Sequence, residues 1–263
     1  MDLDDTVVWV TGASSGIGEA LAGRFAERGA RVVLSARRVA ELERVHQELA
    51  EPERHWVVPL DLADAAGLAP AVERVLELCG RVDVMVHNGG VSQRALARDT
   101  GLAVDRRLME VDYFALVALT KALLPSMRAR GDGRFVVVSS LVGKIGTPLR
   151  SGYSAAKHAL HGFFESLRAE EHAAGVRVTM VCPGFIKTHV SHHALTADGT
   201  PQGTLDRAQA EGMSAQECAR KIVAAVEAGR DEVLVGGPER FAVLAWRLSP
   251  AFFRRLVRRA RVT

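Results

Sequence analysis

Cysteine is scarce in this chain of 263 residues, and its placement excludes two classes of protein. Cys79, Cys182 and Cys218 are an odd number of widely spaced residues, and no two of them have the spacing of metal ligands. A disulfide scaffold and a zinc-binding module are therefore excluded, and we predict no metal site. The thiols are expected to be reduced and mostly buried, as in a reducing compartment.

Long hydrophobic runs are also missing. No stretch of about 18 apolar residues occurs, so we expect no helix that spans a membrane. The chain begins Met-Asp-Leu-Asp-Asp, which is acidic, whereas a secretory signal needs a basic start and an apolar run. These absences predict a cytoplasmic protein, with contact at a membrane surface left open by the tail described below.

A net positive charge is absent from the body of the chain, although the whole chain carries a net charge of +3. Residues 239–263 contain seven Arg and one Glu, a balance of +6, so the remaining residues carry 3 − 6 = −3. A nearly neutral body argues against nucleic acid as a partner.

Short Val-rich runs alternate with longer amphipathic stretches from residue 7 onward. The runs lack polar alternation, which is typical of strands buried on both faces of a parallel sheet. We predict a single α/β domain over 1–238, with a doubly wound parallel sheet of about seven strands and helices on both faces. The predicted strands are 7–10, 31–35, 56–60, 82–87, 135–139, 176–182 and 232–235, and the predicted helices are 17–28, 39–50, 65–78, 102–128, 152–173 and 215–228.

Two segments do not follow this alternation. Residues 187–212 have the weakest pattern and are interpreted as a flexible substrate loop or lid. Residues 239–263 form a basic amphipathic tail, which Pro250 divides into two short helical pieces.

A glycine-rich segment follows the first strand and opens the first helix. Its glycines allow a tight turn and a close approach to a pyrophosphate, and the helix N-terminus offers free N–H groups to the anion. The predicted phosphate-binding residues are Gly12, Ser14, Ser15, Gly16, Ile17 and Gly18.

A carboxylate is missing at the end of the second strand, where proteins that bind NAD usually place one against the ribose 2′-hydroxyl. Arg37 and Arg38 stand there instead. Guanidinium groups would pair with a 2′-phosphate, so we predict a preference for NADP(H) over NAD(H).

Tyr153 and Lys157 are four residues apart at the start of a predicted helix, so their side chains share one face. A neighbouring cation favours the phenolate form, which suits Tyr153 to act as general acid in reduction and general base in oxidation. Ser140 ends the fifth predicted strand, and its hydroxyl can stabilise charge on a substrate oxygen. Strand alternation points the adjacent Ser139 to the other face.

The order and spacing of these motifs resemble the short-chain dehydrogenase/reductase family, from Val7 to about Val235. The resemblance implies a Rossmann fold and hydride transfer between a nicotinamide and a carbonyl/alcohol pair, with Ser140, Tyr153 and Lys157 as catalytic residues. It implies a homodimer or homotetramer assembled through the helices at 102–128 and 152–173. Further cofactor contacts implied by the resemblance are Asp61, Leu62, Asn88, Gly89, Gly90, Val111, Tyr153, Lys157, Pro183, Gly184, Ile186 and Thr188.

The chain departs from the family pattern at three positions, one of which is Gly89, where related proteins usually have Ala. Asp112 stands where the family usually has an Asn that supports a proton relay, and a carboxylate there would partly offset the field of Lys157 on Tyr153. We therefore predict a more alkaline pH–rate profile than Asn would give. His87 replaces an Asn of the family, and we interpret it as a structural substitution.

The segments around Gln93 and Tyr153 resemble a branch that includes dehydrogenase/reductase member 7-like and 11β-hydroxysteroid dehydrogenase-like enzymes. That resemblance favours a lipid-like or steroid-like carbonyl substrate. The candidate substrate contacts are Ser140, Leu141, Val142, Gln93, Leu149, Phe185 and His189.

Three other interpretations stay open. The chain is a catalytically silent sensor or scaffold that binds NADP(H), or it is a 3-oxoacyl-thioester reductase, or it is a peripheral membrane or nucleic-acid module that acts through the tail. The tail itself either packs over the substrate pocket or a subunit, or contacts anionic lipid at a membrane surface.

Overall fold

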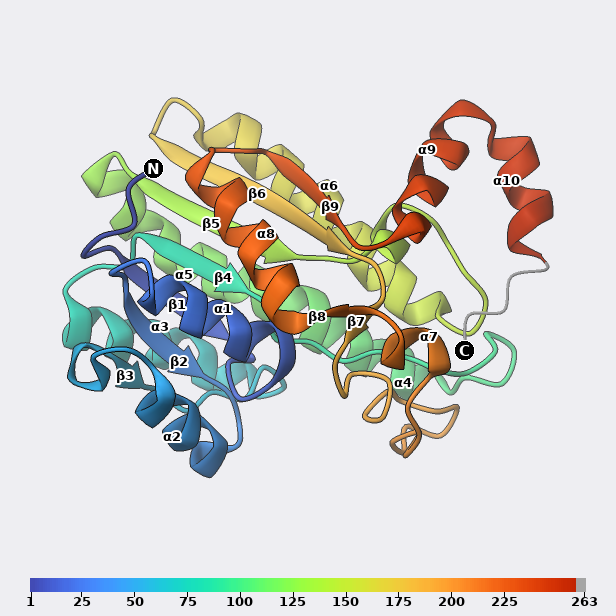
Figure 1. The fold of residues 1–263 in the computed structure, drawn as a ribbon, viewed down its shortest axis with the longest axis horizontal. Helices are drawn as coiled ribbons and strands as arrows, with labels where there is room; N and C mark the ends of the chain where they lie inside the picture. The colour runs from blue at the N-terminus through green and yellow to red at the C-terminus, as the bar shows by residue number, and fades with distance from the viewer. Residues whose placement is uncertain (259–263) are drawn as a thin grey trace.

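Parallel strands form the centre of the structure, a computed structural model that describes residues 1–258 of the chain. The main sheet has seven strands in the order β3-β2-β1-β4-β5-β6-β9, and every neighbouring pair is parallel (Figure 1). This arrangement confirms the predicted doubly wound sheet. The strands are β1 (Val7–Thr11), β2 (Arg31–Ser35), β3 (Trp56–Val57), β4 (Val84–His87), β5 (Gly133–Val138), β6 (Val176–Pro183) and β9 (Glu232–Val235).

Helices cover both faces of this sheet (Figure 1). On one face lie α1 (Gly16–Ala26), α2 (Val39–Glu48) and α8 (Ala215–Glu227), and on the other lie α3 (Ala65–Cys79), α5 (Ala115–Arg130) and α6 (Ser151–Glu171). Alternate residues of one strand serve the two faces: Val8 and Val10 belong to one apolar cluster, and Val7 and Trp9 belong to the other. Burial on both faces explains why the strands lack polar alternation.

The long helix predicted at 102–128 is divided. It consists of α4 (Leu102–Met109), a π-helical turn over Glu110–Phe114, and α5. The turn adds one residue to the helix and places Val111 and Asp112 inside the fold. Such single π turns occur mostly at functional sites.

The third predicted strand, 56–60, pairs over only two residues, Trp56 and Val57. The backbone still follows β2 further, because Val58 N donates to Leu34 O at 3.0 Å and Leu60 N donates to Ala36 O at 3.0 Å. The strand is therefore shorter than predicted, although the direction of the chain is the expected one.

The loop predicted at 187–212 is more ordered than its sequence suggests. It includes α7 (Arg207–Ala210), and β7 (Ile186–Lys187) pairs with β8 (Met213–Ser214) at its two ends. Inside it, Asp206 accepts hydrogen bonds from a buried guanidinium, that of Arg94. The loop is thus attached to the body by a buried ion pair.

The tail forms two short helices, as predicted: α9 (Phe241–Leu248) and α10, which begins at Pro250 and ends at Val257. Both project from the end of the molecule next to β9 (Figure 1). Val243 of α9 packs against Leu141 and Cys182. The last residues of the tail, 259–263, lie outside the described residues. Among residues 1–258, no helix is both long enough and apolar enough to cross a membrane.

Candidate active site

The glycine-rich turn after β1 has the shape that a pyrophosphate site needs. Gly12 and Gly16 adopt positive φ angles of 66° and 61°, a region that favours glycine. A Cβ on Gly18 would lie 2.2 Å from the carbonyl oxygen of Gly12, so only glycine fits there. Ser15 precedes α1 and makes no side-chain capping bond. The N–H groups at the start of α1 are therefore free of a side-chain acceptor and fit a phosphate anion.

Of the two predicted arginines, Arg38 is the one that reaches the turn. Its Nη2 atom donates to Ser14 Oγ at 3.2 Å and to Ser14 O at 3.4 Å. Arg37 is exposed beside it. Burial, followed by the charges of His192 and Arg38, lowers the pKa of His193.

Small residues after β4 are required by crowding. Asn88 Nδ2 donates to Thr11 O at 3.0 Å, which ties this segment to the glycine turn. A Cβ on Gly89 would lie 2.7 Å from Leu62 Cδ1, and a Cβ on Gly90 would lie 2.3 Å from Asp112 Oδ1. Asp61 is exposed next to Leu62.

Two residues that the sequence did not single out hold the chain at 183–188, from the end of β6 onward, which contains Pro183, Gly184, Ile186 and Thr188. Glu239 Oε1 accepts a hydrogen bond from Phe185 N at 3.0 Å. Gln209 Nε2 donates to Ile186 O at 2.5 Å and to Thr188 Oγ1 at 3.5 Å. Both partners lie far along the chain, so no local motif could have indicated them.

Lys157 and Ser140 each contact the carboxyl end of a central strand, β5 and β6 respectively, and Tyr153 lies next to Lys157. Lys157 Nζ lies 5.6 Å from the centre of the Tyr153 ring and donates to Val138 O at 3.3 Å. The Lys157 side chain is only 4% exposed, so its charge acts in a poorly solvated place. Ser140 is half-buried, and its Oγ lies within 3.4 Å of Pro183 O. Ser139 points elsewhere, with Oγ 3.1 Å from His161 Nε2, as alternation predicted.

Asp112 is fully buried and faces the lysine. Its Oδ1 lies 3.6 Å from Lys157 Nζ and accepts a hydrogen bond from Val91 N at 2.9 Å. Its Oδ2 has no protein partner among the described residues. Burial raises the pKa of Asp112, and the Lys157 cation opposes that shift. The predicted closeness of this carboxylate to the lysine is therefore present in the structure.

His87 lies in the core rather than at the site. Its ring stacks on Phe135 at 5.9 Å, and Nε2 lies 2.8 Å from Thr120 Oγ1. Burial, followed by the Lys157 charge, lowers the pKa of His87 to about 3. A neutral, enclosed ring agrees with the structural interpretation.

The predicted substrate contacts separate into two groups. Leu141 and Val142 are buried directly after Ser140, while Leu149 and Phe185 are half-buried and His189 is exposed. Gln93 differs from them, because it is 0% exposed and its side-chain oxygen binds the start of α6. The expectation that Gln93 lines the substrate pocket is therefore corrected: its polar groups are engaged by the protein.

A cluster of ionisable groups lies behind α6. His161, Glu165 and Glu232 have ligand atoms within 4.8 Å of one another, which is close enough for a metal ion. The Lys144 ammonium, however, forms ion pairs with both Glu165 and Glu232. Arg247 Nη2 also lies 3.8 Å from Glu232, so two cations balance the two carboxylates without a metal ion.

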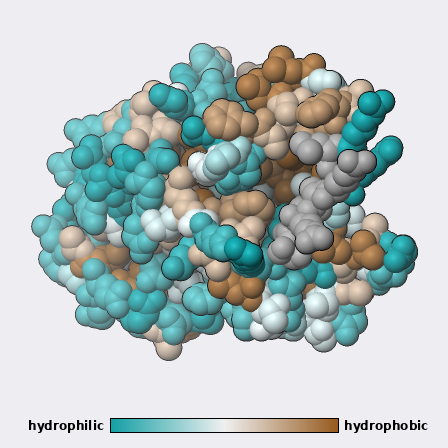
Figure 2. All heavy atoms as spheres, turned by 45° about the vertical axis from the view of Figure 1, so that its right-hand side comes forward, coloured by the Kyte–Doolittle hydropathy of each residue, from teal (hydrophilic) through white to brown (hydrophobic). Residues whose placement is uncertain are grey.

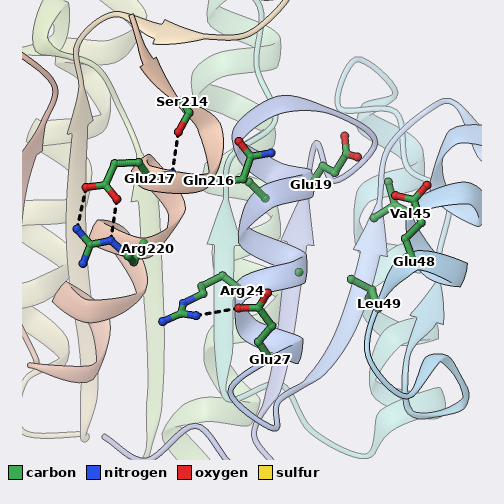
Figure 3. A pocket seen from close by; sticks show the side chains of 12 residues that line it. Glu19, Arg24, Glu27, Val45, Glu48, Leu49, Ser214, Gln216, Glu217 and Arg220 are labelled. Carbon is green, nitrogen blue, oxygen red and sulfur yellow. Dashed lines mark hydrogen bonds and ion pairs between the residues drawn. The ribbon is translucent and has the colours of Figure 1, made fainter.

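A surface pocket of about 550 Å³ lies between α1, α2 and α8. Figure 3 shows Arg24 bonded to Glu27 and Arg220 bonded to Glu217 at its walls. None of the predicted site residues lines it. The other two lining carboxylates, Glu19 and Glu48, pair with Arg44 outside the pocket, so the charges of this surface groove are already satisfied.

The comparisons with known proteins agree with this geometry. Residues 6–198 match the family described as short chain dehydrogenase. The chain belongs to the short-chain dehydrogenase/reductase family. It is 45% identical to dehydrogenase/reductase SDR family member 7B of Mus musculus, over 98% of this chain and 82% of that protein.

Solved structures of the family share the fold. A short-chain dehydrogenase from Streptomyces avermitilis is 29% identical, with a TM-score of 0.82 and 96% of each chain covered. An alcohol dehydrogenase from Thermococcus sibiricus complexed with 5-hydroxy-NADP is 26% identical, with a TM-score of 0.77, over 89% of this chain and 97% of that chain. Membership of this family makes the protein an NAD(P)-dependent oxidoreductase.

Proposed function

We propose that this short-chain dehydrogenase/reductase transfers hydride between NADP(H) and a carbonyl/alcohol pair on an apolar substrate. The observation that carries the proposal is the position of Lys157, which is nearly buried, lies 5.6 Å from the Tyr153 ring and donates to Val138 O at the carboxyl end of β5. Ligands of open α/β sheets bind at that edge.

Each residue of the site has a separate role in the reaction. The nicotinamide, when bound, carries the hydride. Ser140 donates a hydrogen bond to the substrate oxygen and stabilises the charge that develops on it. Tyr153 gives its proton to that oxygen in reduction and accepts one in oxidation. Lys157 favours the phenolate of Tyr153 by its charge and would contact the cofactor ribose, while Asp112 holds Lys157.

The cofactor preference rests on Arg38, which lies over the glycine turn next to Ser14. The Thermococcus sibiricus relative contains an NADP derivative. A paired binding titration tests the preference: we expect NADPH to bind at least about tenfold tighter than NADH, roughly 1.4 kcal/mol. Arg38→Gln should remove most of that difference, and equal affinities in the unsubstituted protein would refute it.

Turnover separates the enzyme from a silent NADP(H)-binding scaffold. The unsubstituted protein should oxidise NADPH in the presence of phenanthrenequinone, a carbonyl probe, and Tyr153→Phe should lower kcat by ~10²-fold or more. NADPH binding without turnover of quinones, ketones or aldehydes would favour the scaffold. Turnover confined to 3-oxoacyl thioesters would favour the thioester reductase.

An apolar substrate is proposed because the residues around Ser140 are apolar. Leu141 and Val142 follow it directly, and Leu149 and Phe185 are half-buried. Loss of a methylene from such a pocket typically changes specificity by about 10–200-fold. We expect kcat/KM to rise with the hydrocarbon length of a ketone series, and a flat series would argue against a lipid-like substrate.

Contact with a membrane surface is proposed as a second property, carried by the tail. Phe241, Leu244, Leu248 and Phe252 are 51–77% exposed, and arginines lie between them. Figure 2 shows hydrophobic side chains gathered on this end of the molecule. Apolar residues with interleaved arginines suit an interface with anionic lipid.

Vesicles test this second property. The protein should sediment with phosphatidylserine-containing vesicles, and Leu248→Glu with Phe252→Glu should abolish that binding. Leu102→Glu, which changes an equally exposed apolar residue on α4, serves as the control. Equal sedimentation of both variants would remove the proposal.

A homodimer or homotetramer through α4, α5 and α6 is also proposed. Phe114 is 51% exposed at the join of the π turn and α5, and its ring contacts Tyr113, which contacts Phe163 of α6. An exposed aromatic cluster is a common interface anchor. Light scattering should show an oligomer that Phe114→Arg dissociates, and a monomeric parent protein would refute it.

A further inference from the structure

We propose that Gln93 is a positioning residue that sets the catalytic tyrosine by capping the helix on which it stands. The inference rests on the proposed function, because it assigns a partner to Tyr153. Gln93 lies 59 residues before Gly152 in the chain and is 0% exposed.

The first turn of α6 lacks a local cap. The residue in the capping position is Arg150, whose side chain makes no capping bond. The first N–H groups of a helix have no partner within the helix, and a short polar side chain normally accepts from the second or third. Gln93 Oε1 takes this place, because it accepts from Gly152 N at 2.8 Å and from Tyr153 N at 3.2 Å.

The cap is itself held from the other side. Gln93 Nε2 donates to Thr100 Oγ1 at 2.9 Å, and that hydroxyl donates to Leu96 O at 2.9 Å. The amide can therefore present only its oxygen to the helix. The backbone around Gln93 is fixed as well, since Ala95 N donates to Leu149 O at 3.1 Å and Arg94 N donates to Leu195 O at 2.8 Å.

These contacts join three segments at one side chain: the strand-like segment 92–95, the substrate loop near Leu195, and the start of α6. The backbone of Tyr153 is one of the two groups bound. A displacement of about 1 Å in a reacting group can cost ~10²-fold in rate. Gln93 thus controls where the Tyr153 hydroxyl lies without touching substrate or cofactor.

Two substitutions at Gln93 separate the effect of its hydrogen-bond acceptor from the effect of an added charge. Gln93→Met keeps the length and removes the acceptor, whereas Gln93→Glu keeps an acceptor and adds a negative charge one helical turn or less from Tyr153. Gln216→Met, on the exposed face of α8, is the matched control. Thr100→Val frees the amide and should give a milder form of the Gln93→Met defect.

With NADPH and phenanthrenequinone, we expect Gln93→Met to lower kcat by ~10–10²-fold while leaving NADPH affinity unchanged. Gln93→Glu should move the pH profile of kcat to higher pH. The chain has two tyrosines, so the near-ultraviolet absorbance of the Tyr153 phenolate can be assigned with Tyr153→Phe. In Gln93→Glu that absorbance should appear at higher pH.

Unchanged kcat in Gln93→Met, or a loss shared equally with Gln216→Met, would overturn the inference. If Gln93→Met does not fold, an unshifted profile and an unshifted phenolate absorbance in Gln93→Glu overturn it. A parent protein that turns over no carbonyl probe would contradict the proposed function, and the phenolate titration would still decide the role of Gln93.

Discussion

Two buried pairs of a cation and a carboxylate differ in how tightly they are made. In the substrate loop, Arg94 donates to Asp206 through Nε at 2.7 Å and lies 2.6 Å from it through Nη2, and both side chains are at most 4% exposed. Near the proposed catalytic groups, Lys157 and Asp112 are equally buried but 3.6 Å apart, and Asp112 Oδ2 has no protein partner among the described residues.

The difference in distance between the two pairs follows from which part of the protein each pair holds in place. Asp206 is saturated, because Gln202 Nε2 also donates to its Oδ1 at 3.0 Å, and the pair fastens the loop. A forked guanidinium suits such a two-point contact. An ammonium is a point charge, and Lys157 keeps part of its donor capacity for other partners. The tight pair therefore suits a structural role, and we propose that the loose one modulates the charge around Tyr153.

The same substitution at each carboxylate tests this comparison and carries the largest expected effect. Asp206→Asn leaves a buried guanidinium without its counter-charge and should lower the free energy of unfolding by about 3–5 kcal/mol. Asp112→Asn should change it by about 1 kcal/mol or less, because the lost pair is offset by relief of a buried, unsatisfied carboxylate oxygen. Urea unfolding measures both, and equal losses would show that the pairs do not differ.

His87 adds a buried titratable group near Lys157. Because burial lowers its folded-state pKa from 6.5 to about 3, the folded state holds it neutral while the unfolded state takes up a proton below 6.5. Its stabilising contribution is present above pH 6.5 and is lost as the pH falls towards 3. Between about pH 7 and about pH 5 this amounts to about 2 kcal/mol.

The variant His87→Asn cannot take up that proton. Its free energy of unfolding should therefore fall less steeply with acidification than that of the parent protein, as followed by urea titrations at each pH. Parallel pH dependences for the two proteins would show that another group dominates acid unfolding.

The smallest expected effect concerns the pH–rate profile. Asp112 offsets part of the charge of Lys157, so Asp112→Asn should strengthen the field of Lys157 at Tyr153 and move the profile of kcat to lower pH by about one unit or less. Glu217→Gln, which removes a carboxylate from the surface helix α8, is the control and should leave the profile in place. An unchanged profile in Asp112→Asn would remove the electrostatic role of Asp112.

Local patterns predicted much of this molecule. The strand at 31–35 was placed at both ends correctly, because its Val-rich run lies between a turn and the arginines that follow. The strand at 232–235 was also placed exactly, and the two tail helices were separated by Pro250, which starts the second of them. Each of these rests on a signal a few residues long.

Other features depended on distant partners and could not be predicted. The π turn that contains Asp112 leaves no clear mark in a helical pattern, since it differs by a single residue. The cap from Gln93 to Tyr153 and the contact from Glu239 to Phe185 span 60 and 54 residues. Gln93 was expected in the substrate pocket because its neighbours resemble the pocket loop, yet burial gave its amide a different partner.

The sequence by itself determined the sheet, the glycine turn, and the spacing of Ser140, Tyr153 and Lys157, because strand burial, tight turns and helical periodicity are local properties. Only the tertiary structure decided how firmly each group is held: how closely Asp112 approaches Lys157, which arginine reaches the glycine turn, and which side chain caps α6. These contacts depend on burial. Burial removes water as an alternative hydrogen-bond partner, so each polar contact between distant segments contributes more to the free energy of the folded state.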